Sequence, residues 1–276
     1  MTVRSAHRSR RTFGVLFTAV TLAVGLGVAA APSTAKPGGT PAAPKPTIVL
    51  VHGVFADASG WNSVIAKLQA QGFPVIAPAN PLRTLEGDSD YVSSVVDSLA
   101  GPVIMVGHSY GGAVITNAAR GHENVEALVY VAAFAPDEGE SPLGLATGFP
   151  GGELGGALLI RDFPGGGKDG YIDPAKFRAV FGADLPASTT RLMAATQRPG
   201  SVEGLSGLSG VPAWATLPSW YVIPTEDKVI PADAQRFMAE RAGSKVLEVK
   251  GASHAVLMSR PDTVLRQILA AYTATR

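Results

Sequence analysis

One serine lies in a setting that favours nucleophilic chemistry. It is the centre of the run Gly107-His108-Ser109-Tyr110-Gly111, which directly follows an apolar stretch typical of a buried strand and directly precedes a stretch with helical spacing. A sharp turn between strand and helix exposes a serine hydroxyl, and glycines give the clearance that such a turn needs. The turn also places the hydroxyl at a helix N-terminus, where backbone N–H groups stabilise an oxyanion. We therefore expect Ser109 to be a nucleophile.

A serine nucleophile needs a general base, and elimination selects one of the five histidines. His7 lies in the basic N-terminal segment, His52 precedes the serine, His108 adjoins it with a side chain expected to point elsewhere, and we expect His122 to be a solvated surface residue. His254 remains, in a loop after the last predicted strand. Because sites on parallel sheets gather at the carboxyl ends of the strands, we expect His254 to be the base.

The carboxylate that orients such a histidine should lie between the serine and the histidine in sequence. Thr225-Glu226-Asp227 follows a predicted strand and precedes a predicted helix. We choose Asp227 over Glu226 because neighbouring side chains point in different directions and Asp227 lies nearer the helix. Asp137, at the end of the preceding predicted strand, is the alternative. A carboxylate bonded to one ring nitrogen of His254 would fix its tautomer and stabilise the imidazolium.

An oxyanion hole needs two backbone donors. Tyr110 supplies one as the residue after the nucleophile, and the loop His52-Gly53-Val54-Phe55 after the first strand supplies the other. We expect Val54 to be this second donor, with Phe55 as the alternative. Gly53 permits the close approach of the chain to a substrate, and His52 should brace the loop.

Six short apolar runs predict strands buried on both faces of a parallel sheet, and the stretches between them have helical spacing. The strands are expected over Thr47 to Val51, Pro74 to Ala77, Val103 to Val106, Ala127 to Phe134, Trp220 to Ile223 and Val246 to Val249. The helices are expected over Ser59 to Gln71, Asp88 to Leu99, Tyr110 to Arg120, Pro231 to Arg241 and Pro261 to Tyr272. This alternation predicts an α/β layered fold with right-handed crossovers.

The interval from about Pro136 to Pro218 interrupts this alternation. It is rich in glycine and proline and holds two short helical candidates, Pro174 to Phe181 and Ser188 to Thr196. An insertion of this length predicts a small cap over the active site. Gly166-Gly167-Lys168 is no phosphate loop, because we expect no strand before it and no Ser or Thr follows the lysine.

The first 35 residues have the pattern of an export signal. A basic segment to Arg11 precedes an apolar run over Phe13 to Ala31, with small residues for cleavage after Ala30 or Ala35. The run Ser9 to Phe13 resembles a twin-arginine motif, and ordinary Sec export is the alternative. We expect residues 36–46 to be a linker, residues 47–276 to be the mature domain, and the protein to be secreted or periplasmic. A membrane anchor is less favoured because three glycines dilute the apolar run.

Composition removes several classes of function. The chain has 276 residues, 46% of them hydrophobic, with 23 Lys and Arg against 22 Asp and Glu. Four of these bases lie in the first 35 residues, so the remainder is slightly acidic and a nucleic-acid partner is not expected. The absence of cysteine excludes disulfides, thiolate metal sites and a cysteine nucleophile. We expect no metal site.

The motifs together resemble the α/β-hydrolase superfamily, over essentially the whole chain after Pro46. The resemblance rests on His52-Gly53, Gly107 to Gly111, Thr225-Glu226-Asp227 and Ser253-His254. Within the superfamily, the run Tyr130 to Ser141 is similar to the branch of small esterases and hydroxynitrile lyases. The resemblance implies a six-stranded parallel core, a modest cap, no cofactor and Asp227 as the acid. The segment Lys36 to Pro46 is too short for the antiparallel strand pair that usually leads this fold.

These observations predict an exported serine carboxylesterase that acts on small to medium hydrophobic esters, because the predicted cap is mostly apolar. We expect Phe55 and Phe134 to contact the substrate. One alternative keeps the same three residues for lyase, carbon–carbon hydrolase or cofactor-free perhydrolase chemistry, with Lys168, Lys176 or Lys228 as an added cation. The other alternative is a ligand-binding relative without hydrolytic activity.

Overall fold

The computed structural model describes residues 44–276. The predicted export signal, its cleavage sites and most of the linker therefore lie outside the described residues. No helix within residues 44–276 combines the length and the apolar character that a membrane span requires.

A six-stranded sheet carries the site, and all six strands expected from the sequence are present. They are β1 (Thr47–Val51), β2 (Val75–Ile76), β3 (Val103–His108), β4 (Val125–Val131), β8 (Ser219–Pro224) and β9 (Lys245–Val249). Their order is β2-β1-β3-β4-β8-β9, and every neighbouring pair is parallel. Because the strands are parallel, the carboxyl ends of β1, β3, β8 and β9 lie at the same end of the sheet. The loops that carry the candidate residues begin there.

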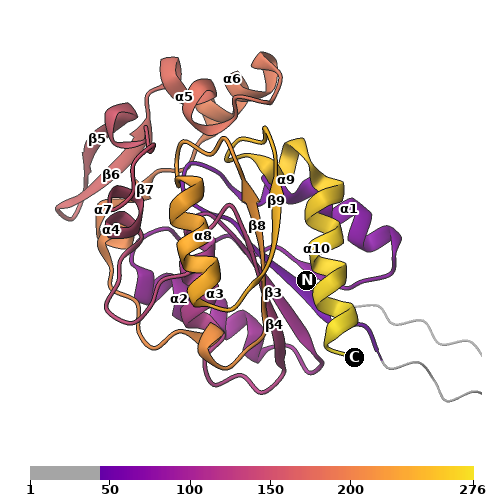
Figure 1. Cartoon of the computed structure of the whole chain (residues 1–276). Helices are drawn as coiled ribbons and strands as arrows, with labels where there is room; N and C mark the ends of the chain where they lie inside the picture. The colour runs from indigo at the N-terminus through magenta and orange to yellow at the C-terminus, as the bar shows by residue number, and fades with distance from the viewer. Residues whose placement is uncertain (1–43) are drawn as a thin grey trace, which may run out of the picture. The chain divides into compact units, whose positions relative to one another are not determined.

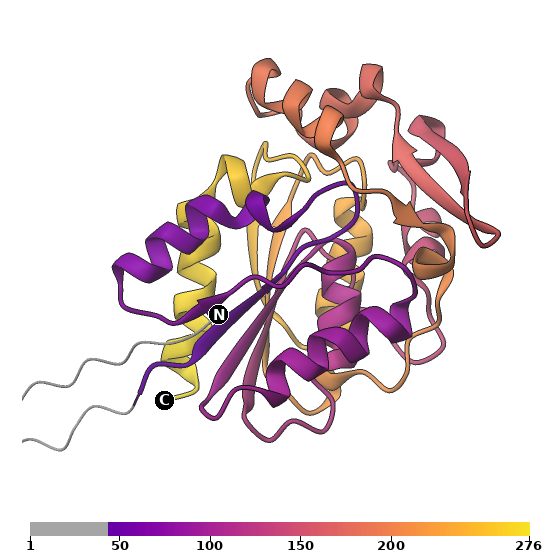
Figure 2. The same cartoon turned by 180° about the vertical axis from the view of Figure 1, so that it is seen from behind.

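Helices cover both faces of this sheet. One face packs against α2 (Leu85–Asp97), α3 (Tyr110–Ala118) and α8 (Ala232–Arg241), and the other against η1 (Ala58–Trp61), α1 (Asn62–Ala70), α9 (Val256–Ser259) and α10 (Pro261–Ala274) (Figures 1 and 2). Successive side chains of a strand point to opposite faces. Along β3, Val103 and Met105 accordingly join one buried cluster, whereas Ile104 and Val106 join the other. The continuous apolar runs thus reflect burial on both sides.

The chain between β4 and β8 forms the cap. It contains α4 (Pro142–Thr147), η2 (Gly155–Ala157), β5 (Leu158–Phe163), β6 (Gly167–Ile172), α5 (Pro174–Phe181), α6 (Ala187–Thr196), β7 (Gly200–Ser201), α7 (Val202–Ser206) and η3 (Ala213–Ala215). Figure 1 shows α5 and α6 over the end of the sheet where the loops that carry the candidate residues begin. The two short helices expected in this interval are α5 and α6.

The cap also holds a small antiparallel sheet, β5-β6-β7, that the sequence did not predict. Gly165 and Gly166, at the turn of the β5–β6 hairpin, have φ values of 103° and 90°, which L side chains rarely adopt. The expectation that no strand precedes the triglycine run is therefore wrong, since β5 does. The run nevertheless turns a hairpin and leads into a strand, so it lacks the helix that a phosphate loop requires.

Candidate active site

Ser109 occupies a strained turn between β3 and α3. Its φ of 55° and ψ of −126° lie in a region that non-glycine residues rarely adopt. Backbone contacts hold this conformation. The Ser109 N–H lies 3.1 Å from the Ala132 carbonyl oxygen, and the Ser109 carbonyl oxygen accepts from Gly112 N–H at 3.0 Å and Phe134 N–H at 3.1 Å. These hydrogen bonds to the surrounding backbone hold the serine in the turn that was predicted from the sequence.

Four glycines are required because the chain passes very close to itself at this turn. A Cβ at Gly107 would lie 2.5 Å from the Gly111 carbonyl oxygen, and one at Gly111 would lie 2.4 Å from the carbonyl oxygen of Val51. A Cβ at Gly112 would meet a carbonyl oxygen at 2.4 Å as well. At Gly53 it would lie 2.6 Å from the Cβ of Ser109. Glycine at these four positions therefore allows β1 and the loop after it to pack directly against the serine turn.

His254 and Asp227 form a buried hydrogen-bonded pair. His254 Nδ1 lies 2.8 Å from Asp227 Oδ2, and both side chains are inaccessible to solvent. Asp227 Oδ1 accepts from the backbone N–H groups of Val229 and Ile230 at 2.8 and 2.9 Å, while Oδ2 also accepts from Gln235 Nε2 at 2.8 Å. Because an ionised carboxylate only accepts, the His254 proton resides on Nδ1. Nε2 then carries the lone pair that a general base needs.

The other two acids considered from the sequence are not bonded to this histidine. Glu226 is exposed, and its backbone N–H donates to the Ala252 carbonyl oxygen at 3.0 Å. Asp137 Oδ1 accepts from the N–H of its own neighbour Glu138 at 2.8 Å. Of these three carboxylates, the structure joins Asp227 to His254.

The two atoms between which a proton would move are both buried and unpartnered. Ser109 Oγ and His254 Nε2 have no hydrogen-bond partner within residues 44–276. Their loops are nevertheless tied together, because the ring of His108, which precedes the serine, bonds to the His254 carbonyl oxygen at 3.0 Å through Nε2. A serine–histidine contact that tightens only when a substrate is bound is common in unliganded enzymes.

His108 is a residue whose role the sequence did not suggest. Its ring lies 4.7 Å from the ring of His254, centroid to centroid, and its edge packs near Phe181. Burial, with a smaller contribution from His254, holds the pKa of His108 well below its usual range. The neutral ring donates its Nε2 proton to the carbonyl oxygen of His254. His108 thereby supports the loop of the expected base.

Backbone geometry distinguishes the two candidates for the second oxyanion donor. The N–H of Phe55 donates to the Arg198 carbonyl oxygen at 2.8 Å, whereas the N–H of Val54 has no hydrogen-bond acceptor among the described residues. Tyr110 is the first residue of α3, so its N–H has no acceptor within the helix. The free N–H groups are thus those of Val54 and Tyr110.

His52 braces the first of these loops, as expected. The Asn80 N–H donates to His52 Nε2 at 3.1 Å, so the ring proton is on Nδ1, which lies 2.9 Å from the Gly53 carbonyl oxygen. Burial lowers the pKa of His52, which keeps the ring neutral in this role.

Tyr110 is anchored by Asp88, a carboxylate that no sequence pattern indicated. Its phenol O–H donates to Asp88 Oδ2 at 2.8 Å, and both Asp88 oxygens accept from the N–H of Arg83. Burial raises the pKa of Asp88, and burial together with Asp88 raises the pKa of Tyr110. This bond fixes the residue that would present an oxyanion donor.

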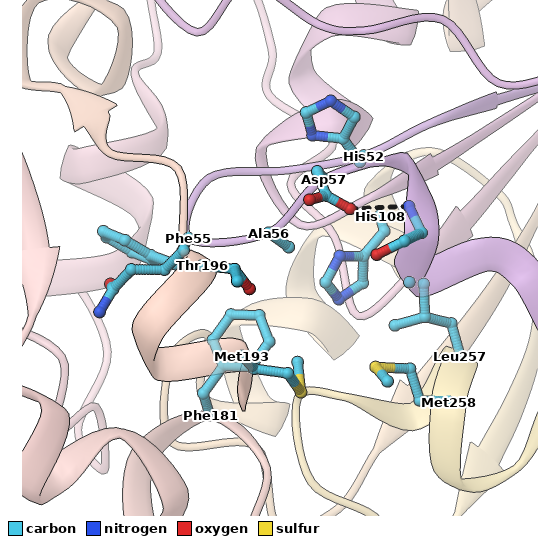
Figure 3. A pocket seen from close by; sticks show the side chains of 13 residues that line it. His52, Phe55, Ala56, Asp57, His108, Phe181, Met193, Thr196, Leu257 and Met258 are labelled. Atoms are coloured by element: carbon cyan, nitrogen blue, oxygen red, sulfur yellow. Dashed lines mark hydrogen bonds between the residues drawn. The ribbon is translucent and has the colours of Figure 1, made fainter. Parts of the chain in front are cut away.

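A small apolar cavity of about 40 Å³ adjoins the site. Its wall includes Phe55, His108, Phe181, Met193, Leu257 and Met258. Figure 3 shows Met193 and Met258 pointing toward one another near the His108 ring. Phe134, the other aromatic residue expected to contact substrate, is buried but does not line this cavity.

Three lysines considered as additional cations are engaged elsewhere. Lys168 pairs with Asp162 at 2.8 Å, Lys228 pairs with Glu153 at 2.9 Å, and Lys176 donates to a backbone carbonyl oxygen. None lines the cavity beside His108. Within residues 44–276, no three His, Asp or Glu side chains gather as a metal-binding group.

His122 differs from its expected placement. Its side chain is only 10% exposed, and Nε2 lies 2.7 Å from the Ser93 hydroxyl. The expectation of a solvated residue is therefore wrong, because α2 packs over the end of α3 and covers the ring.

Comparisons with known proteins agree with this architecture. The model of the alpha/beta hydrolase family matches residues 48–267. The chain is 27% identical to an alpha-hydroxynitrile lyase from Arabidopsis thaliana, over 82% of this chain and 96% of the relative, and 26% identical to methylesterase 8 of the same plant, over 82% and 89%. A crystal structure of a polyneuridine aldehyde esterase variant superposes with a TM-score of 0.70 at 22% identity, over 82% of this chain and 98% of that chain. Since the family model covers most of its length, the chain belongs to the alpha/beta hydrolase family.

Proposed function

We propose that the protein is a serine carboxylesterase that cleaves small to medium hydrophobic esters through an acyl-enzyme. One observation carries the proposal. His254 donates a buried hydrogen bond from Nδ1 to Asp227, which leaves its Nε2 unprotonated, and this atom and the Ser109 hydroxyl both lack partners in the described part of the chain. Burying two polar atoms without hydrogen-bond partners costs free energy, and a bound substrate would supply the missing contacts.

The proposed reaction has two acyl-transfer steps. Ser109 Oγ attacks the ester carbonyl carbon while His254 Nε2 takes the hydroxyl proton. The Val54 and Tyr110 N–H groups bind the oxyanion, which typically contributes about 3–4 kcal/mol per donor. His254 then passes the proton to the departing alkoxide. Water then attacks the acyl-enzyme while His254 takes its proton. The carboxylic acid is released and Ser109 is regenerated.

The surroundings of the site support hydrophobic substrates. Phe55, Phe181 and two methionines form much of the adjoining wall, against which hydrophobic acyl or alcohol groups would pack. Anionic esters would have to lose their hydration against this wall, where the one charged side chain of the lining is the carboxylate of Asp57, which repels them.

We propose that the protein is exported by residues 1–35. The support is the pattern of a basic segment, an apolar run and small residues at the cleavage positions. The N-terminal sequence of protein recovered from the culture medium should begin at residue 31 or 36. Replacing Arg10 and Arg11 with lysine should block export by the twin-arginine route and leave Sec export intact. Retention of the unprocessed chain in the cell would contradict the proposal.

Turnover and active-site labelling test the esterase proposal. Ser109→Ala should lower turnover of p-nitrophenyl butyrate about a thousandfold or more. A fluorophosphonate should label Ser109 in the parent protein. Ser59→Ala is a matched control, because Ser59 lines the adjoining cavity without belonging to the proposed mechanism, and it should stay within about threefold of the parent. Near-normal activity of the Ser109 variant would overturn the assignment.

Lyase chemistry is the second candidate because of the similarity to an alpha-hydroxynitrile lyase. A panel of p-nitrophenyl esters run beside a cyanohydrin separates the two reactions. Faster cleavage of the cyanohydrin would replace the esterase proposal, and the absence of both turnover and labelling would indicate a ligand-binding relative.

A further inference from the structure

The cap is bonded directly to the loop that carries His254. The Ala255 N–H donates to the Phe181 carbonyl oxygen at 3.1 Å, and the Ser253 hydroxyl donates to Asp184 Oδ1. The ring of Phe181 also packs edge-on against the His254 ring, with centroids 4.9 Å apart. The cap therefore contacts the residue before the histidine, the residue after it and the imidazole itself.

A separate part of the cap holds the other catalytic loop. The Arg198 carbonyl oxygen accepts from the Phe55 N–H at 2.8 Å. Gly200 of β7 packs so closely on Val54 that a Cβ there would lie 2.7 Å from Val54 Cγ1. The segment that would present the second oxyanion donor is thus also in contact with the cap.

The reactive atoms are closed off in this arrangement. Ser109 Oγ and His254 Nε2 are both buried, and the adjoining cavity is far smaller than an ester with its acyl and alcohol groups. Substrate must therefore enter by a displacement of the cap. Because the cap is bonded to the histidine loop, a displacement of the cap would break these bonds, and its return would restore them.

We propose that Asp184 is a positioning residue that acts through Ser253 to hold His254 in place when the cap is closed. Asp184 lies between α5 and α6, its side chain is only 14% exposed, and its second oxygen has no hydrogen-bond partner in the described residues. Arg260 Nη1 is 3.8 Å from that oxygen. A largely buried carboxylate is costly, and its bond to a hydroxyl is charge-assisted and directional.

This proposal rests on the esterase proposal for its kinetic consequence. A misplacement of about 1 Å in a catalytic group costs on the order of a hundredfold in rate. Asp184→Ala and Ser253→Ala should each lower kcat by about 10- to 100-fold with KM changed less than about threefold. The double variant should be little worse than either single variant, because both remove the same bond. Asp184→Asn keeps an acceptor for the Ser253 hydroxyl and should recover most of kcat.

A matched control separates positioning from a general effect on the cap. Asp173 caps the N-terminus of α5 through a bond to Ala175 N–H, so Asp173→Ala disturbs the same helix without touching the histidine loop. It should lower thermal stability but leave kcat within about threefold. Equal losses of kcat for Asp173→Ala and Asp184→Ala, or additive losses in the double variant, would overturn the proposal.

Amide hydrogen exchange tests the same proposal without any turnover. Asp184→Ala should raise exchange in residues 251–256 and leave residues 53–56 unchanged, since these are held by Arg198 instead. Unchanged exchange in residues 251–256 would overturn the positioning role. If a fluorophosphonate does not label the parent protein, that result counts against the esterase proposal instead. The two failures are therefore distinguishable.

Discussion

Replacing Asp227 with asparagine tests the proposed base at constant side-chain size. One carboxylate oxygen accepts from the N–H groups of Val229 and Ile230, and the other accepts from Gln235 and His254. Asparagine offers one acceptor oxygen and one NH₂ group. If its oxygen keeps the two backbone bonds, the NH₂ group faces two donors, Gln235 Nε2 and His254 Nδ1.

This conflict reverses the tautomer of the histidine. His254 relieves it by carrying its proton on Nε2, so that Nδ1 accepts from the new amide. Nε2 then has no lone pair for the Ser109 proton, and the imidazolium formed during reaction lacks a buried counter-charge. We expect kcat at neutral pH to fall by about 10³ to 10⁴, which corresponds to about 4–5.5 kcal/mol in the barrier. The unfavourable contact with Gln235 should also lower stability by about 1–3 kcal/mol.

The assay is steady-state turnover of p-nitrophenyl butyrate, with urea unfolding to verify that each variant is folded. Asp137→Asn is the matched control, since it makes the same chemical change at the other strand end and should alter kcat less than about threefold. A loss below tenfold in folded Asp227→Asn, or a greater loss at Asp137, would refute the assignment of the acid.

Three further changes probe the packing and charge around the site. Gly53→Ala places a Cβ 2.6 Å from that of Ser109, so kcat/KM should fall about a hundredfold and urea unfolding should show a loss of about 1–3 kcal/mol; an unimpaired variant would contradict the close approach. Burial keeps the pKa of His108 well below 6.5, so the unfolded chain takes up a proton that the folded protein does not as the pH falls below about 6.5. Unfolding free energy should drop there by up to about 1.4 kcal/mol per pH unit, and the slope should be shallower in His108→Gln. Arg241 lowers the pKa of Glu140, so this pair stabilises the fold above about pH 4.5 and the stabilisation is lost as the pH falls through the lowered pKa. Glu140→Gln should cost about 0.5–1 kcal/mol at pH 7 and almost nothing at pH 3, and an equal cost at both would rule out the ion pair.

The sheet could be predicted from the sequence because its signal is local. Each strand of a sheet covered on both faces is a short run of apolar residues, and Thr47–Val51 and Val103–His108 show this pattern directly. The parallel arrangement then places the strand ends, and whatever loops follow them, at one edge. The pairing of Asp227 with His254 followed from that edge and from the small number of histidines.

The cap sheet could not be predicted in the same way. β5 is mostly exposed, and its Arg161 and Asp162 interrupt any apolar pattern, while β6 begins with Gly167 and contains Gly170. Such strands are specified by the hairpin turn and by packing on the core, which a local pattern does not record. The supporting residues Gln235 and Asp88 were missed for a related reason. The sequence does not distinguish a polar helix residue that is buried against a site residue from one that faces solvent.

The strain at Ser109 and the bonds from the cap divide the proposed machinery into two parts. Ser109 and the Tyr110 N–H are fixed by the sheet and α3, where added atoms at the glycines would clash with backbone. His254 and Val54 lie in loops that are bonded to, or packed against, the cap. The nucleophile is thus held by core contacts, whereas the loops of the base and of the second oxyanion donor have contacts with the cap in addition to those with the core. On this reasoning, perturbing the cap should slow proton transfer and oxyanion binding while leaving the conformation of the serine turn intact.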